Sequence, residues 1–150
     1  MRHSKRPHDQ VAWDLVRGAR VPRKYIKGTW QEHNAFSPAV VTKGGTVIWL
    51  AGHANPRDEA DKSLADDFEA QVHGTFKFLS ETLAKAGGRL QDIVTMTVFL
   101  RDARQGPTFL EIRKGYFPEG FPASALITAA GFAVPEMLIE IQAIAVIGDE

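Results

Sequence analysis

The chain has 150 residues and is 44% hydrophobic, which suits one globular domain with a core of its own. Its 18 Lys and Arg residues balance its 18 Asp and Glu residues, so the sequence has no electrostatic footprint for nucleic acid. The lack of cysteine excludes disulfides, thiolate catalysis and cysteine-ligated zinc. No apolar run approaches the ~18 residues of a membrane helix, and the basic first residues lack the apolar segment of a signal peptide. We therefore expect a cytoplasmic protein.

Residues 1–35 are interpreted as an N-terminal arm, and residues 36–150 as the domain proper. The first residues are polar and are predicted to be disordered, and residues 11–18 (VAWDLVRG) could form a short helix. The rest of the arm mixes aromatic and charged residues without a clean period. We expect the arm to be partly disordered or to pack on something, such as a neighbouring subunit.

Two β-branched runs, residues 38–42 and 46–51, flank a Lys-Gly-Gly turn. This pattern predicts a β-hairpin, because paired glycines supply the positive φ of a tight turn. Gly52 and His53 follow the second run directly. A glycine at a strand end permits another group to approach the backbone closely.

An amphipathic helix is predicted from a capping-box sequence at residues 63–66 (SLAD) to about residue 86. Two glycines follow it and provide a left-handed stop. Residues 92–100 alternate as a strand, and residues 108–117 predict a second, shorter helix. The apolar positions of the long helix recur at spacings of three and four: Phe68, Val72, Phe76, Leu79 and Leu83.

The closing stretch, residues 121–147, organises the rest of the chain. We interpret it as two strands, 123–132 and 137–147, joined by a short turn. The second strand is apolar on both faces and needs cover on both, so we infer an oligomer whose subunits pack sheet to sheet. The order β-β-α-β-α-β-β predicts an α+β fold, a mixed sheet with two helices on one face.

Glu140 interrupts the apolar pattern of the last strand. A carboxylate there is costly unless it is paired or hydrogen-bonded. Either it lies at a strand edge or pairs with a nearby Lys or Arg, or it lines a pocket.

His53 also has two possible roles. It is a surface histidine, or it forms with Glu140 an acid/base set for water attack on a C=N or C=C bond. No pair of histidines has metal-ligand spacing.

Three stretches together resemble the RidA/YjgF family: GTVIWLAGH, LAKAGGRLQDIVTMTVFLRD, and FPASALI followed by MLIEIQAIAV. The resemblance implies a chorismate-mutase-like α+β unit and a homotrimer with a barrel-like core, external helices and clefts between subunits. It also implies hydrolysis of reactive 2-enamines and 2-imines to 2-oxo acids and ammonia, with no metal and no cofactor. In the family an arginine binds the substrate carboxylate, and a glutamate helps to place the water.

Some of the family's cleft residues match this sequence and others do not. Glu140 matches the glutamate, and Gly52 matches the glycine of the pocket wall. Phe36 stands where a tyrosine is common, Leu110 where an asparagine is often found, and Leu126 where a cysteine or another small side chain is common. The resemblance implies that all five lie at the cleft.

The largest departure from the family is Ser124, which stands where the carboxylate-binding arginine belongs. A guanidinium binds a carboxylate through two parallel hydrogen bonds, whereas serine offers one hydroxyl and no charge. Arg113, on the second helix, either supplies a cation from elsewhere or is a solvated helix residue. We therefore expect weak activity on the imines of ordinary amino acids, which Ser124→Arg should raise if only the carboxylate clamp is missing.

The leading functional hypothesis is a cofactor-free hydrolase or deaminase of a small enamine, imine or related metabolite, with altered specificity. The alternative is a non-catalytic protein that binds a small metabolite or a partner through the same cleft. A ribonuclease or translation inhibitor is the third hypothesis, and the neutral charge counts against it.

Overall fold

The computed structural model describes residues 21–28 and 33–148 of the chain. The predicted disorder at the start of the chain and the predicted helix over residues 11–18 lie outside the described residues. The elements follow the order β1-β2-β3-α2-β4-α3-β5-β6, with short 3-10 helices before β4 and before α3. This order confirms the α+β class and adds one strand, β1, to those that the sequence predicted.

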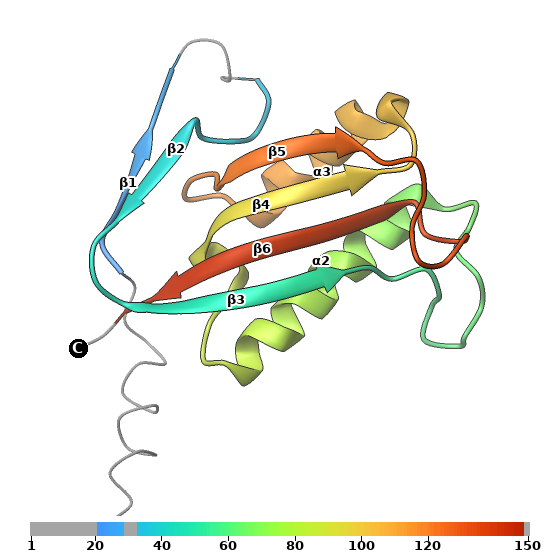
Figure 1. Ribbon diagram of the computed structural model, residues 1–150, viewed down its shortest axis with the longest axis horizontal. Helices are drawn as coiled ribbons and strands as arrows, with labels where there is room; N and C mark the ends of the chain where they lie inside the picture. The colour runs from blue at the N-terminus through green and yellow to red at the C-terminus, as the bar shows by residue number, and fades with distance from the viewer. Residues whose placement is uncertain (1–20, 29–32, 149–150) are drawn as a thin grey trace, which may run out of the picture.

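A mixed four-stranded sheet forms the centre of the fold (Figure 1). Its strand order is β3 (Thr46–His53), β6 (Ile139–Ile147), β4 (Ile93–Leu100) and β5 (Ala123–Thr128). β6 runs antiparallel to both of its neighbours, and β4 and β5 run parallel. The closing strands β5 and β6 follow each other in the chain, yet β4 lies between them in the sheet, so their connection is not a hairpin.

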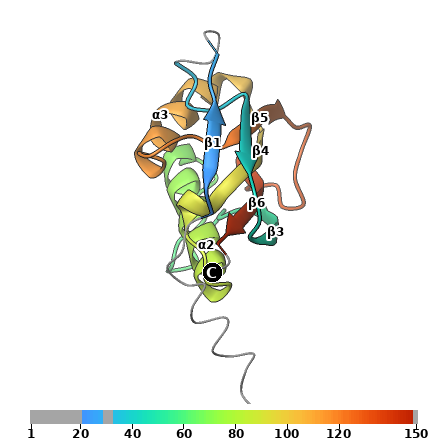
Figure 2. The ribbon, with the colours of Figure 1, turned by 90° about the vertical axis from the view of Figure 1, so that its left-hand side faces the viewer.

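Both helices, α2 (Phe68–Lys85) and α3 (Gly106–Tyr116), cover the same face of the sheet (Figure 2). None of the described helices is long and apolar enough to cross a membrane. The predicted apolar stripe of α2 is confirmed, because all five of its members are buried in the core. They pack against buried residues of the sheet, among them Met96, Val98, Ile139 and Ile141.

The predicted capping box does not start α2. The helix begins at Phe68, and the side chain of Asp67 accepts a hydrogen bond from the backbone N–H of Ala70. Ser63 instead belongs to the preceding loop, where its hydroxyl accepts from the N–H of Ala65. Asp67 provides the N-terminal cap that the sequence analysis assigned to Ser63.

The predicted hairpin between residues 38–42 and 46–51 is also wrong. β2 (Ala39–Thr42) pairs with β1 (Arg23–Ile26) in a separate two-stranded sheet, and β3 pairs with β6. Gly44 and Gly45 do adopt positive φ, 71° and 90°, but they redirect the chain from one sheet into the other. Paired glycines predict a turn, and the strand that the chain joins after the turn depends on distant residues.

Arg23 anchors β1 to the main sheet. Its guanidinium donates to the carbonyls of Gln91, at 2.8 Å, and Val146, at 3.1 Å, and lies 3.8 Å from the carboxylate of Asp92. Part of the predicted arm is therefore built into the same protomer. The boundary at residue 35 stays a prediction.

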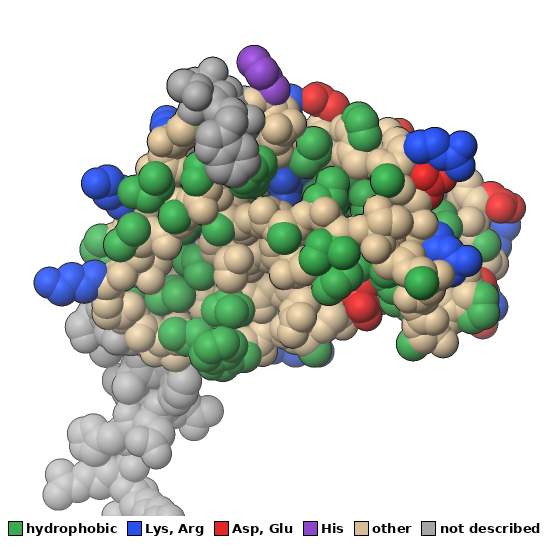
Figure 3. All heavy atoms as spheres, turned by 45° about the horizontal axis from the view of Figure 1, so that its top comes forward, with side chains coloured by type: hydrophobic (Ala, Val, Ile, Leu, Met, Phe, Trp, Pro, Cys, Tyr) green, Lys and Arg blue, Asp and Glu red, His purple; other side chains and the backbone are tan. Residues whose placement is uncertain are grey.

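The sheet face opposite the helices, called the open face below, is left exposed by residues 21–28 and 33–148. Trp49 on β3 is 77% exposed there, and Val47 and Ile127 are each 44% exposed. Hydrophobic side chains gather over this region in Figure 3, while most of the charged ones lie around its rim. The predicted apolar second face of the sheet is thus present, and none of the described residues covers it.

Candidate functional site

Glu140 lies on the open face of the central strand β6. Its neighbours Ile139 and Ile141 point into the core, and Glu140 itself is half-buried opposite Phe99 of β4. Its carboxylate accepts no hydrogen bond from any described residue and pairs with none of the described cations. Of the alternatives from the sequence, the strand edge is wrong, because β6 lies between β3 and β4, and an ion pair is not found among the described residues. The role of Glu140 in lining a pocket stays a prediction.

Gly52 provides the wall against which this carboxylate rests. The pairing of β3 with β6 is irregular between Leu50 and His53, so the backbone bulges at Gly52. A Cβ atom at Gly52 would lie 2.8 Å from Cδ of Glu140, which is closer than such atoms approach. In this position the Glu140 carboxylate occupies the space that a side chain at position 52 would need, so a larger residue there would have to displace it.

His53 faces the other side of the sheet. It lies opposite Ile141, whose side chain is in the core. Its Nδ1 is 2.8 Å from the carbonyl oxygen of Ala51, and its Nε2 is 2.8 Å from the hydroxyl oxygen of Thr82 on α2. Both ring nitrogens are therefore engaged, and the expected pair of His53 with Glu140 is not brought together within one protomer.

A second group of predicted residues centres on Arg113 of α3. This arginine is only 1% exposed, so it is not a solvated helix residue. Its Nη1 donates to the hydroxyl oxygen of Ser124 at 2.6 Å, and its Nη2 donates to the carbonyl of Asn34 at 3.1 Å. The guanidinium carbon lies 5.0 Å from the ring centre of Phe109. Burial lowers the pKa of Arg113 to about 10.

The Arg113 guanidinium has no counter-charge among the described residues. None of their carboxylates forms an ion pair with it, and its Nε has no hydrogen-bond partner. A buried charge without a partner is energetically costly. The burial of Arg113 could have been predicted from its spacing, because it lies four residues after Phe109, on the buried face of α3.

The remaining predicted residues lie along α3 and β5. Leu110 is half-buried and packs on the core, and Leu126 is exposed on the edge strand beside Gly106. Phe36 lines a pocket of about 480 Å³ with several aromatic residues. The next residue, Ser37, bridges to Ala123 of β5, directly before Ser124. The aromatic residues are Tyr25, Phe117 and Phe121.

The predicted residues therefore form two groups that one protomer keeps apart. Gly52 and Glu140 lie on the open face, at β3 and β6. Ser124 lies opposite the buried Met96, so its side chain is on the helix face of the edge strand β5, beside Arg113. The strand β4 separates β6 from β5. Within the part of the chain that the structure describes, the two groups therefore do not form one site.

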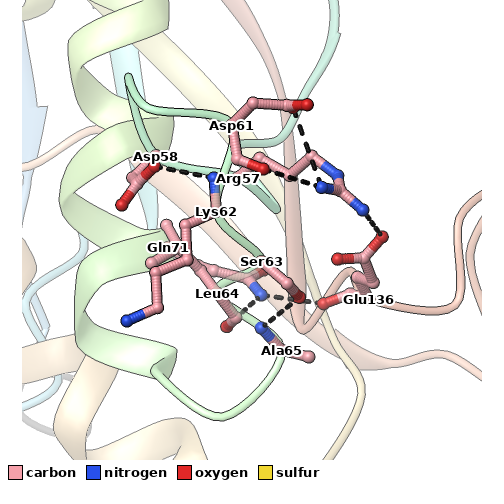
Figure 4. A network of polar contacts seen from close by, with 9 residues as sticks. All are labelled: Arg57, Asp58, Asp61, Lys62, Ser63, Leu64, Ala65, Gln71 and Glu136. Atoms are coloured by element: carbon pink, nitrogen blue, oxygen red, sulfur yellow. Dashed lines mark hydrogen bonds and ion pairs between the residues drawn. The ribbon is translucent and has the colours of Figure 1, made fainter.

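A polar network fixes the loop that leads into β6 (Figure 4). The buried amide of Gln71 donates to the carbonyls of Leu64 and Glu136, each at 2.8 Å, and accepts from the N–H of Leu138 at 2.9 Å. These bonds hold the backbone two residues before Glu140. The pKa of the Glu136 carboxyl is lowered, most by its hydrogen bond with the Ser63 hydroxyl and next by the Arg57 guanidinium, whose Nη2 lies 2.9 Å from Oε1 of Glu136. The helical pattern gave no signal for this role of Gln71.

The fold is that of a small α+β protein in which no described residue covers the second face of the main sheet, and the candidate residues lie in two separate groups. The family model described as Endoribonuclease L-PSP matches residues 29–147. The chain belongs to this family, the RidA/YjgF family.

Relatives in the family support the same assignment. The chain is 30% identical over 127 residues to the 3-aminoacrylate deaminase RutC of Acinetobacter baylyi, covering 83% of this chain and 98% of that protein. It is 29% identical to a RutC family protein of Pyrococcus abyssi, covering 73% and 84%.

Solved structures show the same fold. YyfB of Yersinia pestis, from the conserved Rid protein family, superposes with a TM-score of 0.73 at 24% identity, covering 83% of this chain and 98% of that one. Rv2704 of Mycobacterium tuberculosis, from the YjgF/YER057c/UK114 family, gives 0.59 at 22% identity, covering 83% and 99%.

Proposed function

We propose that the protein is a deaminase-like hydrolase of a small enamine or imine. The observation that carries this proposal is the carboxylate of Glu140, which rests against Gly52 on an otherwise neutral sheet face without a described partner. Such a carboxylate is available to a bound water. The named activity of the relative RutC, on 3-aminoacrylate, supports the same class of reaction.

The chemistry needs one water and no redox step. An enamine first takes a proton on carbon and becomes an iminium ion. Glu140 orients a water and accepts a proton from it as the oxygen attacks the iminium carbon. Glu140 returns this proton to the nitrogen of the resulting carbinolamine. Ammonia then leaves and takes up the hydroxyl proton as the C=O bond forms. The sum for the iminium is R₂C=NH₂⁺ + H₂O → R₂C=O + NH₄⁺.

We further propose that the complete site forms between subunits of a homotrimer. Glu140 and Gly52 of one copy then face Ser124, Leu110 and Leu126 of the next. The separation of the two groups within a protomer supports this arrangement, and so does the exposed apolar face. His53 is given no proton-transfer role, because both of its ring nitrogens are engaged within the protomer.

The test is ammonia release from enamines generated in situ, with 3-aminoacrylate and the imines of common amino acids as substrates. The wild-type protein should accelerate release above the spontaneous rate. Glu140→Gln keeps the shape of the side chain and should lower turnover by roughly 10²-fold or more, the usual contribution of a general base. Glu81→Gln, an exposed site on α2, is the matched control. Full turnover by Glu140→Gln would refute the assignment.

A non-catalytic binding protein is the second candidate, and Ser124 favours it. No guanidinium replaces the family's arginine at this position on β5, so the strongest carboxylate clamp is missing there. In that case the protein would bind small 2-oxo acids or enamines without accelerating ammonia release. The same assay, run beside a binding measurement, separates the two candidates.

A further inference from the structure

We propose that residues 11–18 of the N-terminal arm bind in an apolar groove beside β3 of the same protomer. The groove has a volume of about 530 Å³ and is lined by residues 46–49 of β3 and residues 85–87 at the C-terminal end of α2. It lies toward the start of β3, whereas Gly52 lies near the end of that strand. The inference therefore goes beyond the proposed function and does not depend on it.

The groove follows the outer edge of β3, which is the first strand of the four-stranded sheet. Both faces of the strand contribute to it, Ile48 from the helix face and Trp49 from the open face. Trp49 is the most exposed large hydrophobic side chain of the described residues. An apolar edge strand is prone to pair with other chains, and proteins commonly cover such an edge with a helix or a loop. A segment in this groove would cover the edge of β3.

The described chain begins at one end of this groove. Val21 is 3% exposed, and its side chain occupies the space that a Cβ at Gly45 would need, directly before β3. Arg23 holds this entry point, because its guanidinium donates to the carbonyls of Val21 and Val146. β1 and β3 accordingly start at the same end of the molecule (Figure 1). Residues 1–20 therefore join the described chain beside the groove.

The length of the segment also fits the groove. Residue 18 is three residues before Val21 and so lies at most about 11 Å from it. A helix over residues 11–18 would be about 12 Å long, and the four residues of β3 that line the groove span about 10–13 Å. An isolated helix of this length is marginal in water and needs packing to form. The groove offers that packing within reach of Val21.

The side chains of the segment match the lining of the groove. The sequence VAWDLVRG places Ala12, Leu15 and Val16 on one side of a helix, and the described lining is mostly apolar. Asp14 is the one acidic residue of the segment, and Lys85 is the one charged residue of the described lining, so the two charges are complementary. The segment also precedes the region that the family model matches, so its binding would be a feature of this chain rather than of the shared fold.

The test attaches a nitroxide to a thiol introduced by Gln10→Cys, directly before the segment, in the full isotope-labelled chain. The chain has no cysteine, so the nitroxide is unique. An excess of unlabelled wild-type chain restricts its effect to one protomer of any oligomer. The amide NMR signals of residues 46–49 and 85–87 should lose most of their intensity relative to the reduced nitroxide. The signal of Leu126, on the opposite edge strand β5, should keep its intensity.

Two variants of the spin-labelled chain test the contact from its two sides. Leu15→Asp puts a charge on the apolar side of the segment and should restore the signals, because an unpaired charge is costly to bury. Ala86→Phe fills the groove from the wall at the end of α2 and should restore the signals of residues 46–49 with the arm unchanged. Ser4→Asp adds the same charge outside the segment and is the matched control, which should leave the loss of intensity as it is.

Full intensity at residues 46–49 in the chain with an unaltered segment would overturn the inference, as would a loss of intensity that survives Leu15→Asp. Spin-labelled chains mixed with isotope-labelled chains that carry no nitroxide test a neighbouring copy as the partner. If the signals of the groove are lost only in this mixture, the arm binds that neighbour and the inference is wrong. Ammonia release is measured separately, and its absence would refute the deaminase while the groove contact stands.

Discussion

Glu140 and Arg113 are charged residues at positions where the local pattern calls for an apolar side chain. The alternation of β6 predicted which face of the strand Glu140 occupies, because the side-chain period of a strand is two. For Arg113, the sequence left burial and exposure to solvent as alternatives. Its helix is short, and its hydrogen-bond partners lie outside that helix, Ser124 on the next strand and Asn34 before β2.

The contact between Arg113 and Ser124 changes the expected effect of Ser124→Arg. Alone, this substitution places two guanidinium groups against each other in a buried site. Like charges about 4 Å apart repel by roughly 4 kcal/mol at an effective dielectric constant near 20. We expect the single variant to unfold at lower temperature than the wild type and to gain no activity. Thermal melts and the ammonia assay measure both effects.

The double variant Arg113→Met with Ser124→Arg moves the cation from α3 to β5. It should recover most of the lost stability, because one charge is removed. It should also hydrolyse amino-acid imines faster than the wild type, since its guanidinium contacts the carboxylate directly. A single variant that is both stable and more active would show that Arg113 is not held where the structure places it.

At the scale of the elements, the sequence predicted their types and approximate positions, and it failed on two of their connections. The stripe of α2 and the alternation of β4 and β6 are periodic and local, so they can be identified without tertiary information. The pairing of β2 with β1 and the placement of β4 between β5 and β6 depend on contacts between distant segments. A turn sequence does not encode these partners.

Gly74 in the middle of α2 illustrates a constraint between elements. Replacing a helical glycine with alanine ordinarily stabilises by about 1 kcal/mol. Here the new Cβ would lie 2.7 Å from Cγ and 2.9 Å from Cβ of Asn55, in the loop after β3. We expect Gly74→Ala to destabilise the protein by roughly 1–3 kcal/mol, the usual cost of overpacking. Chemical denaturation measures this difference.

Gly115 of α3 is the matched control, because a Cβ there meets nothing within 4 Å. Gly115→Ala should be neutral or stabilising by up to about 1 kcal/mol. The loss in Gly74→Ala should be partly reversed by a second substitution, Asn55→Ala, since the two residues share one space. Equal stability of both alanine variants would remove the packing argument.

At the scale of the whole molecule, the uncovered sheet face predicts association. Light scattering should give a mass near three times 16.5 kDa. Trp49→Glu places a charge on the most exposed large side chain of that face and should shift the mass toward the protomer, because a buried unpaired charge is costly. Phe78→Glu, on the helix layer, should not change the mass. A wild-type monomer at micromolar concentration would refute the trimer.

The same trimer predicts which residues of different copies face each other. Glu140 and Leu126 lie on opposite faces of one protomer, with β4 between their strands, so a short cross-linker cannot join them within it. The chain has no cysteine, which makes introduced thiols unique. The variant Glu140→Cys with Leu126→Cys is treated with a bismaleimide of about 8–10 Å reach. It should give covalent dimers and trimers, because each cleft of a closed ring joins unlike patches of two copies.

Each single variant, and Phe78→Cys with Leu126→Cys, should remain largely uncross-linked. If the double variant gives no more cross-linking than these controls, Glu140 and β5 of the next copy do not share a cleft, and the divided site is not completed in this way.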